Sequence, residues 1–249
     1  MQKEERQKYI LGQICQANRV CVTTLSRELD VSDDTVRRDL TELDKKGLLT
    51  KVHGGAVPNS GISIRYVDRL NADMREKQQM AAKVIPLLSK NDVVLLDGGT
   101  SNLEVALQIP QDFPLTVFTN SFPIANALMD CPHVDLNFIG GKVLPDSQVT
   151  VGLPVFKSLQ EIRPDWTIIG ISDIHPIEGL TCPDREEAMI KRAMMERGEK
   201  NIVLAGSCKL NKARTYKVAG LSDLDYLITS DDKVDYIKQN WPAFSYQVL

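Results

Sequence analysis

Two short helical patterns separated by only three residues restrict the fold of this chain more than any other feature. The first has leucines four residues apart and begins at Thr23 or Thr24, either of which would cap it. The second follows the tight connection 30–32, with Ser32 as its expected N-cap and two acidic residues in its first turn. Its apolar residues recur at i, i+4 and i+7, and Gly47 ends it. This spacing predicts a helix-turn-helix.

Signals on either side of this pair complete a small domain. A charged helix is predicted from about Lys3 to Ala17. After the helix-turn-helix, two short strands at 48–52 and 56–57 flank the glycine turn 53–55. One helix, a helix-turn-helix and a two-stranded wing predict a winged helix-turn-helix DNA-binding domain over residues 1–57.

The last helix of this domain is expected to enter the major groove, where a helix-turn-helix places its second helix. Arg37 and Arg38 are the candidates for reading a base, because a guanidinium suits guanine O6 and N7. The other candidates for DNA contacts, mainly with phosphates, are Thr23, Ser32, Asp33, Thr35, Thr41, Lys45, Lys46, Lys51 and His53. A small charged helical bundle that binds no DNA is the alternative interpretation.

The charge of the chain does not exclude a nucleic-acid partner. The 249 residues sum to −3, yet residues 1–60 hold ten Lys and Arg against nine Asp and Glu, with basic residues on the recognition helix and wing. A charged N-terminus and the lack of any bilayer-length apolar run predict a cytoplasmic protein with no membrane partner. Five cysteines without a CxxC pair indicate neither a disulfide framework nor a zinc site.

The rest of the chain predicts a second domain. Residues 58–75 have the character of a linker and the start of a connecting helix that runs from Leu70 to Leu88. Over 76–249, apolar runs alternate with helical segments, which is typical of a doubly wound, largely parallel α/β sheet. The predicted strands are 93–96, 115–119, 134–139, 166–171, 201–205, 226–229 and 244–249, and the predicted helices are 102–108, 123–129, 154–161, 185–197 and 233–240.

Small and polar residues cluster where these strands end, the edge at which open α/β sheets bind ligands. Gly98 and Gly99 can expose backbone N–H groups, and Thr100 and Ser101 add hydroxyls at a helix N-terminus, which makes an anion cradle. Asp97 would repel phosphate but could accept sugar hydroxyls. The other such loops contain Thr119, Asn120, Ser121, Gly140, Gly141, Lys142 and Lys209. A tight structural turn is the alternative for any one loop, and neither Walker A nor GxGxxG is present.

The segments LSREL at 25–29, TVRRDL at 35–40, KGLL at 46–49 and KVHGGA at 51–56 resemble the N-terminal signature of the DeoR family of bacterial transcriptional regulators. The second half resembles the same family at 97–101, 119–121, 140–142, 179–181, 186–191 and 207–209. The resemblance implies a sugar-phosphate-sensing domain similar in fold to ribose-5-phosphate isomerase, glucosamine-6-phosphate deaminase and CoA transferases. It also implies a repressor of carbohydrate catabolism genes.

By the same resemblance, residues 98–101 and Lys209 would bind phosphate, with Asp97, Asn120 and Glu187 near the sugar. A solvated loop lysine remains the alternative for Lys209, and an i, i+4 surface pair for Glu187 with Lys191. The expected small molecule is therefore a phosphorylated sugar effector, with no cofactor and no metal. Because operators contain repeated half-sites, a homodimer or homotetramer is expected.

Two segments depart from the family pattern. Cys208 stands where a second Ser or Thr is common, so one hydroxyl donor is expected to be missing. Segment 170–175 is less rich in glycine and places Asp173 and His175 two residues apart beside the proposed pocket. Asp173 is therefore a further effector-contact candidate, and the two residues could act as acid and base in an isomerisation. A sugar-phosphate isomerase or deaminase with an appended helical module is the alternative function.

Overall fold

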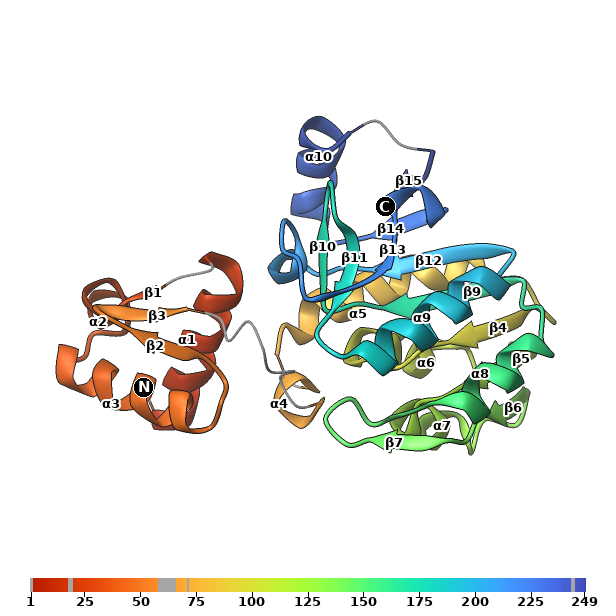
Figure 1. The fold of residues 1–249 in the computed structure, drawn as a ribbon, viewed down its shortest axis with the longest axis horizontal. Helices are drawn as coiled ribbons and strands as arrows, with labels where there is room; N and C mark the ends of the chain where they lie inside the picture. The colour runs from red at the N-terminus through yellow and green to blue at the C-terminus, as the bar shows by residue number, and fades with distance from the viewer. Residues whose placement is uncertain (1, 18–19, 58–65, 71, 243–244) are drawn as a thin grey trace. The chain divides into compact units, whose positions relative to one another are not determined.

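The structure is a computed structural model that describes residues 2–17, 20–57, 66–70, 72–242 and 245–249. The chain divides into two compact units, residues 1–64 and 65–249, which are described separately (Figure 1). Most of the predicted linker, residues 58–65, lies outside the described residues, as does Phe244 at the start of the last predicted strand.

The first unit is a winged helix-turn-helix. Its helices are α1 (Lys3–Ala17), α2 (Val22–Leu29) and α3 (Asp33–Lys45), and its antiparallel sheet has the order β1 (Val20–Cys21), β3 (Gly55–Val57), β2 (Thr50–Val52). The apolar faces of the three helices meet in one buried cluster with the wing. The predicted helix-turn-helix and wing are confirmed, while strand β1 was not predicted because two residues carry no periodic signal.

Capping residues set the ends of the two helices. Ser32 caps α3 as predicted, since its Oγ accepts a hydrogen bond of 3.3 Å from the N–H of Thr35. Asp30 ends α2 in the left-handed conformation, at φ 52°. The prediction that Thr23 or Thr24 caps α2 is wrong, because Cys21 is the N-cap and both threonines lie within the helix. Cys21 makes no side-chain capping hydrogen bond, and its backbone pairs with Gly55 of β3.

The wing needs both of its glycines. His53 and Gly54 form the two-residue turn between β2 and β3, with Gly54 at φ 78°. Gly55 follows in β3 directly against β1, where an added Cβ would lie 1.8 Å from the carbonyl oxygen of Val20. Turn geometry therefore explains one glycine, and close approach of a neighbouring strand explains the other.

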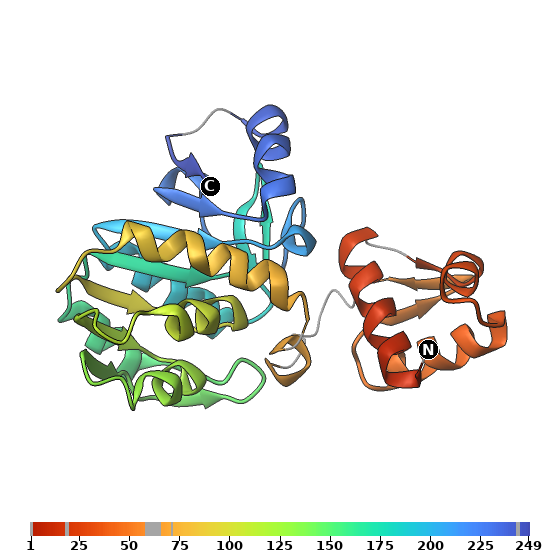
Figure 2. The same ribbon diagram turned by 180° about the vertical axis from the view of Figure 1, so that it is seen from behind.

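The second unit is built on a seven-stranded parallel sheet. Its order is β15 (Gln247–Val248), β14 (Tyr226–Ile228), β12 (Lys200–Leu204), β9 (Trp166–Gly170), β4 (Val93–Leu96), β5 (Leu115–Thr119), β6 (Val134–Phe138). Helices α5 (Met74–Val84), α6 (Thr100–Gln108) and α7 (Phe122–Leu128) cover one face (Figure 2). Helices α8 (Leu153–Gln160) and α9 (Arg185–Arg197) cover the other (Figure 1). The predicted doubly wound α/β class is confirmed.

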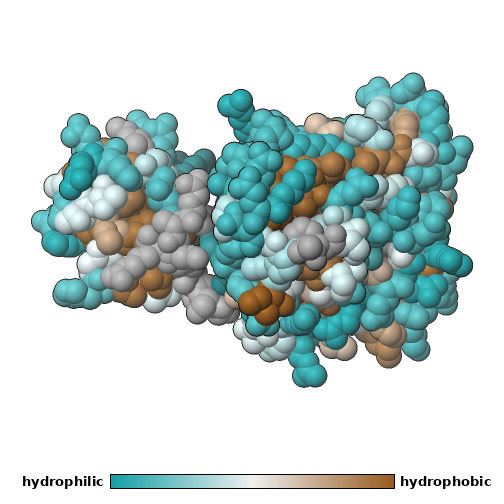
Figure 3. Space-filling model, turned by 90° about the horizontal axis from the view of Figure 1, so that it is seen from above, coloured by the Kyte–Doolittle hydropathy of each residue, from teal (hydrophilic) through white to brown (hydrophobic). Residues whose placement is uncertain are grey.

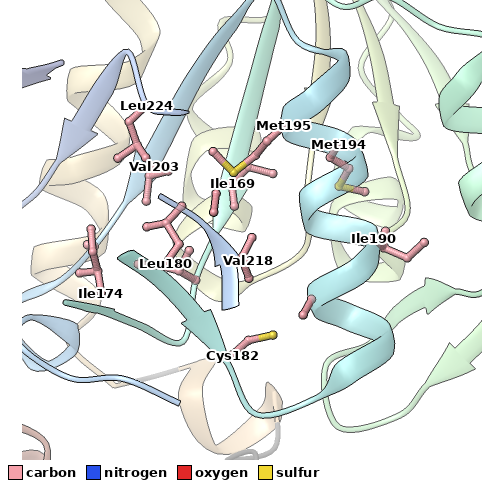
Figure 4. Packing of buried hydrophobic residues seen from close by; sticks show 14 of the residues in the cluster. Ile169, Ile174, Leu180, Cys182, Ile190, Met194, Met195, Val203, Val218 and Leu224 are labelled. Carbon is pink, nitrogen blue, oxygen red and sulfur yellow. The ribbon is translucent and has the colours of Figure 1, made fainter. Parts of the chain in front are cut away.

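Two small antiparallel elements on this unit were not predicted. Strands β10 (Asp173–His175), β11 (Gly179–Cys182) and β13 (Tyr216–Ala219) form one sheet, and β7 (Lys142–Leu144) and β8 (Val149–Val151) form a hairpin. Figure 4 shows Ile174 and Leu180 of the small sheet near each other and Val218 closer to α9, and all three belong to the buried cluster that contains Ile169 of the large sheet. Segment 179–181, one of the segments that resemble the family's second half, lies in the buried strand β11.

The predicted connecting helix is wrong in its extent. The chain instead forms α4 (Tyr66–Leu70), then α5, which ends in a short 3-10 turn, Ile85–Leu87. Asp73 precedes α5 in the left-handed conformation, at φ 49°, so no continuous helix crosses it. The last helix, α10 (Asp231–Asn240), begins two residues before its predicted start.

The face drawn in Figure 3 is mainly hydrophilic, with separate hydrophobic patches. One exposed aromatic pair, Phe122 with Phe138, has ring centroids 5.1 Å apart. In the described parts of the chain, no helix is both long enough and apolar enough to cross a bilayer. The same residues contain no group of three His, Cys, Asp or Glu side chains suited to a metal ion.

Candidate functional site

The outward face of α3 carries the residues predicted to read DNA. Val36, Leu40 and Leu43 hold the opposite face in the core, so Arg37 and Arg38 project into solvent. The other predicted residues of this helix and its cap are Ser32, Asp33, Thr35, Thr41 and Lys45, all exposed or partly exposed. The amphipathic spacing therefore leaves a polar helix face accessible to a groove.

The two arginines differ in their partners. The guanidinium of Arg37 lies 3.3 Å from Asp34 Oδ1 and 3.9 Å from Asp33 Oδ2. Arg38, also exposed, has no hydrogen bond or ion pair within the described chain. Arg38 can thus contact a base without losing an interaction within the protein. Arg37 must give up its contacts with Asp33 and Asp34 to do so, and each of these exposed ion pairs stabilises the helix by at most about 1 kcal/mol.

The wing is tied to the recognition helix through Lys51. Its Nζ donates to Thr41 Oγ1 over 2.8 Å, and its N–H donates to Asp44 Oδ1 over 3.1 Å. His53 is exposed in the turn, and Thr23 is exposed in the first turn of α2. Lys46 is also exposed, and its Nζ lies 3.5 Å from Gln7 Oε1 of α1. The wing and α2 thus present cationic and hydroxyl groups suited to phosphates.

A buried ion pair holds the recognition helix from behind. Asp39 of α3 is 2% exposed, and its Oδ2 lies 2.5 Å from Nε of Arg6 in α1. Gln7 adds a hydrogen bond of 3.4 Å to Asp39 Oδ1. Sequence reasoning missed this pair, since Arg6 and Asp39 are 33 residues apart and each resembles an ordinary surface charge. The pair orients the helix without facing DNA itself.

The candidate effector site is a cleft of about 370 Å³, its open mouth included, at the carboxyl ends of β4 and β9. The cleft is lined by Arg69, Gly98, Gly99, Thr100, Ser101, Ser147, Val149, Gly170, Ile171, Ser172, Glu187, Lys191 and Lys209. Six predicted residues, 98–101 with Glu187 and Lys209, therefore meet in one cleft.

The glycine loop at the cleft is shaped by packing as well as by its own conformation. Gly99 is the N-cap of α6 at φ 127°, which a residue with a side chain rarely adopts. An added Cβ at Gly98 would lie 2.2 Å from Val149 of strand β8. Thr100 and Ser101 then start α6, so its free N–H groups and positive terminus open toward the cleft.

Three buried charges interact at the cleft, two of them in its lining and one, Asp97, outside it. Lys191 of α9 pairs with Asp97 Oδ2 and lies 3.2 Å from Glu187 Oε1. Burial raises the pKa of Asp97, whereas the attraction of Asp97 and Glu187 outweighs burial and raises the pKa of Lys191. Asp97 also accepts the N–H of Gly170 over 3.0 Å and does not line the cleft. The prediction that Asp97 is free to accept sugar hydroxyls is therefore wrong, and Glu187 with Lys191 is a buried pair rather than a surface pair.

Two further cations at the cleft, Arg69 and Lys209, form no ion pair with a described carboxylate. Lys209 makes no side-chain hydrogen bond or ion pair within the described chain, and burial lowers its pKa. The Nε of Arg69 is buried without a hydrogen-bond partner, and burial lowers the pKa of its guanidinium. With Asp97 beneath it counted, the cleft holds three cations against two carboxylates, and the one positive charge left over favours an anion. Arg69 and Ser147 were missed because neither lies in a glycine-rich loop.

The loop after β5 lies outside the cleft. Thr119, Asn120 and Ser121 are each at most 1% exposed. Thr119 Oγ1 accepts the N–H of Ser121 over 3.1 Å, and Asn120 Nδ2 donates to the carbonyl of Thr150 over 2.8 Å. The oxygens Asn120 Oδ1 and Ser121 Oγ have no partner among the described residues. Strand β8 covers this loop, so it does not face the proposed ligand.

The loop after β6 is structural. An added Cβ at Gly141 would lie 2.6 Å from the carbonyl of Val151, so close packing accounts for this glycine; Gly140 has open space beside it. Lys142 is exposed and lies 2.5 Å from Glu186. The prediction of an anion cradle at 140–142 is wrong, because none of the three lines the cleft.

Asp173 and His175 lie outside the cleft as well. Asp173 is buried and pairs with Arg214, and burial raises its pKa. His175 Nδ1 accepts the N–H groups of Ile177 and Glu178, over 3.2 and 3.3 Å, in the β10–β11 turn. An acid–base pair for isomerisation is therefore not assembled.

The segment at Cys208 has one hydroxyl, that of the neighbouring Ser207, and this hydroxyl donates a hydrogen bond to Glu76 Oε1 over 2.6 Å.

Comparisons with known proteins agree with both units. The family described as "DeoR-like helix-turn-helix domain" matches residues 6–61, and "DeoR C terminal sensor domain" matches residues 72–231. The chain is 32% identical to the HTH-type transcriptional repressor GlcR of Bacillus subtilis, over 92% of this chain and 89% of GlcR. It is 30% identical to a putative aga operon transcriptional repressor of Escherichia coli O157:H7, over 91% and 86%. Ribose 5-phosphate isomerase A of Methanocaldococcus jannaschii aligns with 54% of this chain and 53% of its own, at 15% identity and a TM-score of 0.40.

Proposed function

Because the chain belongs to the DeoR family, we propose that it is a cytoplasmic DNA-binding transcriptional regulator rather than an enzyme. In this proposal it represses carbohydrate catabolism genes and responds to a phosphorylated sugar or sugar derivative. Residues 1–57 bind operator DNA, and the second unit binds the effector. No cofactor takes part.

The observation that carries the effector proposal is the uncompensated positive charge of the cleft. Lys191 has two carboxylate partners, but Arg69 and Lys209 have no ion-pair partner there. Burying cations without counter-charges is unfavourable unless a ligand supplies them. A phosphate dianion would do so, with the amides and hydroxyls at the start of α6 as further donors.

The DNA proposal rests on the free face of α3. Arg38 contributes a possible two-pronged contact to guanine, and Lys51 and His53 contribute phosphate contacts from the wing. One such module contacts too little DNA for selective binding, so we propose a homodimer or homotetramer on repeated half-sites. An effector that prefers the non-binding arrangement by about 2.7 kcal/mol would weaken operator affinity a hundredfold.

A gel-shift with the promoter upstream of the chain's own gene tests the proposal. We expect a retarded complex whose affinity changes with one or more sugar phosphates from a panel. Lys209→Gln and Thr100→Val should weaken the effector response, so that more sugar phosphate is needed, and keep operator affinity, whereas the exposed control Lys90→Gln should keep both. Lys51→Ala should lower the slope of log affinity against log salt by about one.

The result that refutes the proposal is equally direct. A chain that binds no promoter fragment with or without sugar phosphates is not the regulator proposed. A chain that binds DNA while Lys209→Gln responds to the effector like the parent has its effector site elsewhere.

A further inference from the structure

Helix α4 brings an arginine into the cleft from the segment that follows the DNA-binding unit in the chain. Arg69 is the fourth residue of this five-residue helix and lines the cleft together with the negatively charged Glu187. The remaining lining residues come from within 98–209. Any ligand that engages Arg69 therefore contacts the first described element after residues 58–65.

Helix α4 is hydrogen-bonded to the rest of the second unit, but two of its buried polar groups have no partner among the described residues. The N–H of Tyr66 donates to the carbonyl of Asp146 over 2.7 Å, and Lys77 Nζ donates to the carbonyl of Arg69 over 2.5 Å. The buried hydroxyl of Tyr66 and the buried Nε of Arg69 have no partners among the described residues. Lys77 itself is buried, and this lowers its pKa to about 8. Helix α4 thus docks with polar groups left unsatisfied, which is unfavourable.

We propose that Arg69 is an effector-binding residue whose contact with the ligand's anionic group stabilises α4 on the second unit. This inference rests on the proposed function and adds the residue that couples occupancy of the cleft to the segment leading to the DNA-binding unit. The guanidinium suits a phosphate because its planar fork can donate two parallel hydrogen bonds. The contact supplies the missing partner of Nε, so the bound state holds α4 more firmly than the free state.

Lys209 has a different role in this arrangement. It lies in the 3-10 turn Ser207–Lys209, after β12, and is therefore neither part of α4 nor close to it in the sequence. Both cations attract the anion, but only Arg69 transmits its binding to α4. The two residues can therefore be separated by experiment.

The test measures two quantities on the full-length chain with inorganic phosphate as the probe. Phosphate affinity comes from thermal shift, because a ligand that binds only the folded state raises Tm. The order of α4 comes from hydrogen exchange of a peptide covering 66–70, read by mass spectrometry. The variants are Arg69→Gln, Arg69→Lys, Lys209→Gln and the exposed control Arg75→Gln from neighbouring α5.

In the parent and in Arg75→Gln, saturating phosphate should slow exchange of the 66–70 peptide at least threefold. Lys209→Gln should bind phosphate at least tenfold more weakly and still show this slowing at saturation. Arg69→Gln should also bind at least tenfold more weakly, with no slowing at saturation. Arg69→Lys, which keeps the charge and loses the fork, should recover affinity only in part and serves as the folded comparison if Arg69→Gln is unstable.

The outcomes separate this inference from the proposed function. If phosphate binds the parent without changing exchange at 66–70, or if Arg69→Gln matches the parent in both quantities, the role of Arg69 is refuted and the regulator proposal stands. If the parent binds neither phosphate nor any sugar phosphate of the panel, the anion site itself is refuted.

Discussion

Lys191→Met is expected to destabilise the second unit by about 3–5 kcal/mol at pH 8, because it leaves two buried carboxylates without their cation. In the parent chain the Lys191 side chain is 4% exposed, Asp97 2% and Glu187 13%. Methionine retains most of the aliphatic volume of lysine, so the loss of charge dominates the change. Since domains are stable by about 5–15 kcal/mol, this loss is a third or more of the total for many domains.

Urea unfolding followed by tryptophan fluorescence measures this effect in the second unit alone. Both tryptophans of the chain, Trp166 and Trp241, lie in that unit and are buried. With a slope of about 2 kcal/mol per molar urea, the midpoint should fall by about 1.5–2.5 M without a change in slope. The exposed Lys90→Met is the matched control and should leave the midpoint within about 0.3 M.

The pH dependence identifies the cause of the loss. Burial raises the pKa of Asp97, and removal of Lys191 should raise it further. The folded variant then binds protons more readily than the unfolded chain, so its deficit relative to the parent should shrink as pH falls from 8 to 5. Adding Asp97→Asn to Lys191→Met should recover at least about 1 kcal/mol. A deficit below about 1 kcal/mol, or one equal at pH 5 and pH 8, would refute the reasoning.

Three further predictions concern single side chains. Arg38→Ala should weaken operator binding by about 1–3 kcal/mol in a gel-shift at fixed salt, and Arg37→Ala by less, because Arg37 gives up two carboxylate contacts on binding; the reverse order would contradict the assignment. Gly55→Ala should disrupt the wing and abolish operator binding, because the added Cβ would clash with the carbonyl oxygen of Val20. Normal operator binding would show that β1 can move to accommodate the methyl group. Lys77 has a pKa of about 8 in the folded chain against an ordinary 10.5, so the unfolded chain binds more protons between these values. The unfolding free energy of the parent relative to Lys77→Met should therefore rise with pH by up to about 3 kcal/mol, as measured by urea unfolding, and a flat difference would exclude this role.

Local signals made the DNA-binding unit predictable. The cap at Ser32, the apolar repeat of α3 and the stop at Gly47 act within a few residues, and the structure follows all three. The boundary of α2 was predicted less well, because pairing of Cys21 with β3 sets it from 34 residues away. Prediction failed at this end because a tertiary contact overrode a capping preference.

The ligand edge was only partly predictable for a related reason. Parallel strands bring all their carboxyl ends to one edge, but the packing of other elements decides which loops stay open. The β7–β8 hairpin covers the loop at 119–121 and packs against Gly141, whereas the loop at 98–101 stays at the cleft. Glycines that looked alike in the sequence therefore differ in their place: Gly98 and Gly99 line the cleft, whereas Gly141 packs against Val151 away from it.

By itself, the sequence determined the two-unit organisation, the winged helix-turn-helix, the parallel α/β class and the set of polar loops, because each depends on short-range periodicity, capping or turn chemistry. Only the tertiary structure decided which charges are neutralised and which are left for a ligand. Asp97 is paired with Lys191, and Asp173 with Arg214, across long sequence separations. Arg69 lines the cleft, and its buried Nε has no hydrogen-bond partner among the described residues. The free energy of a buried charge depends on its neighbours in space, and these are set by packing rather than by position along the chain.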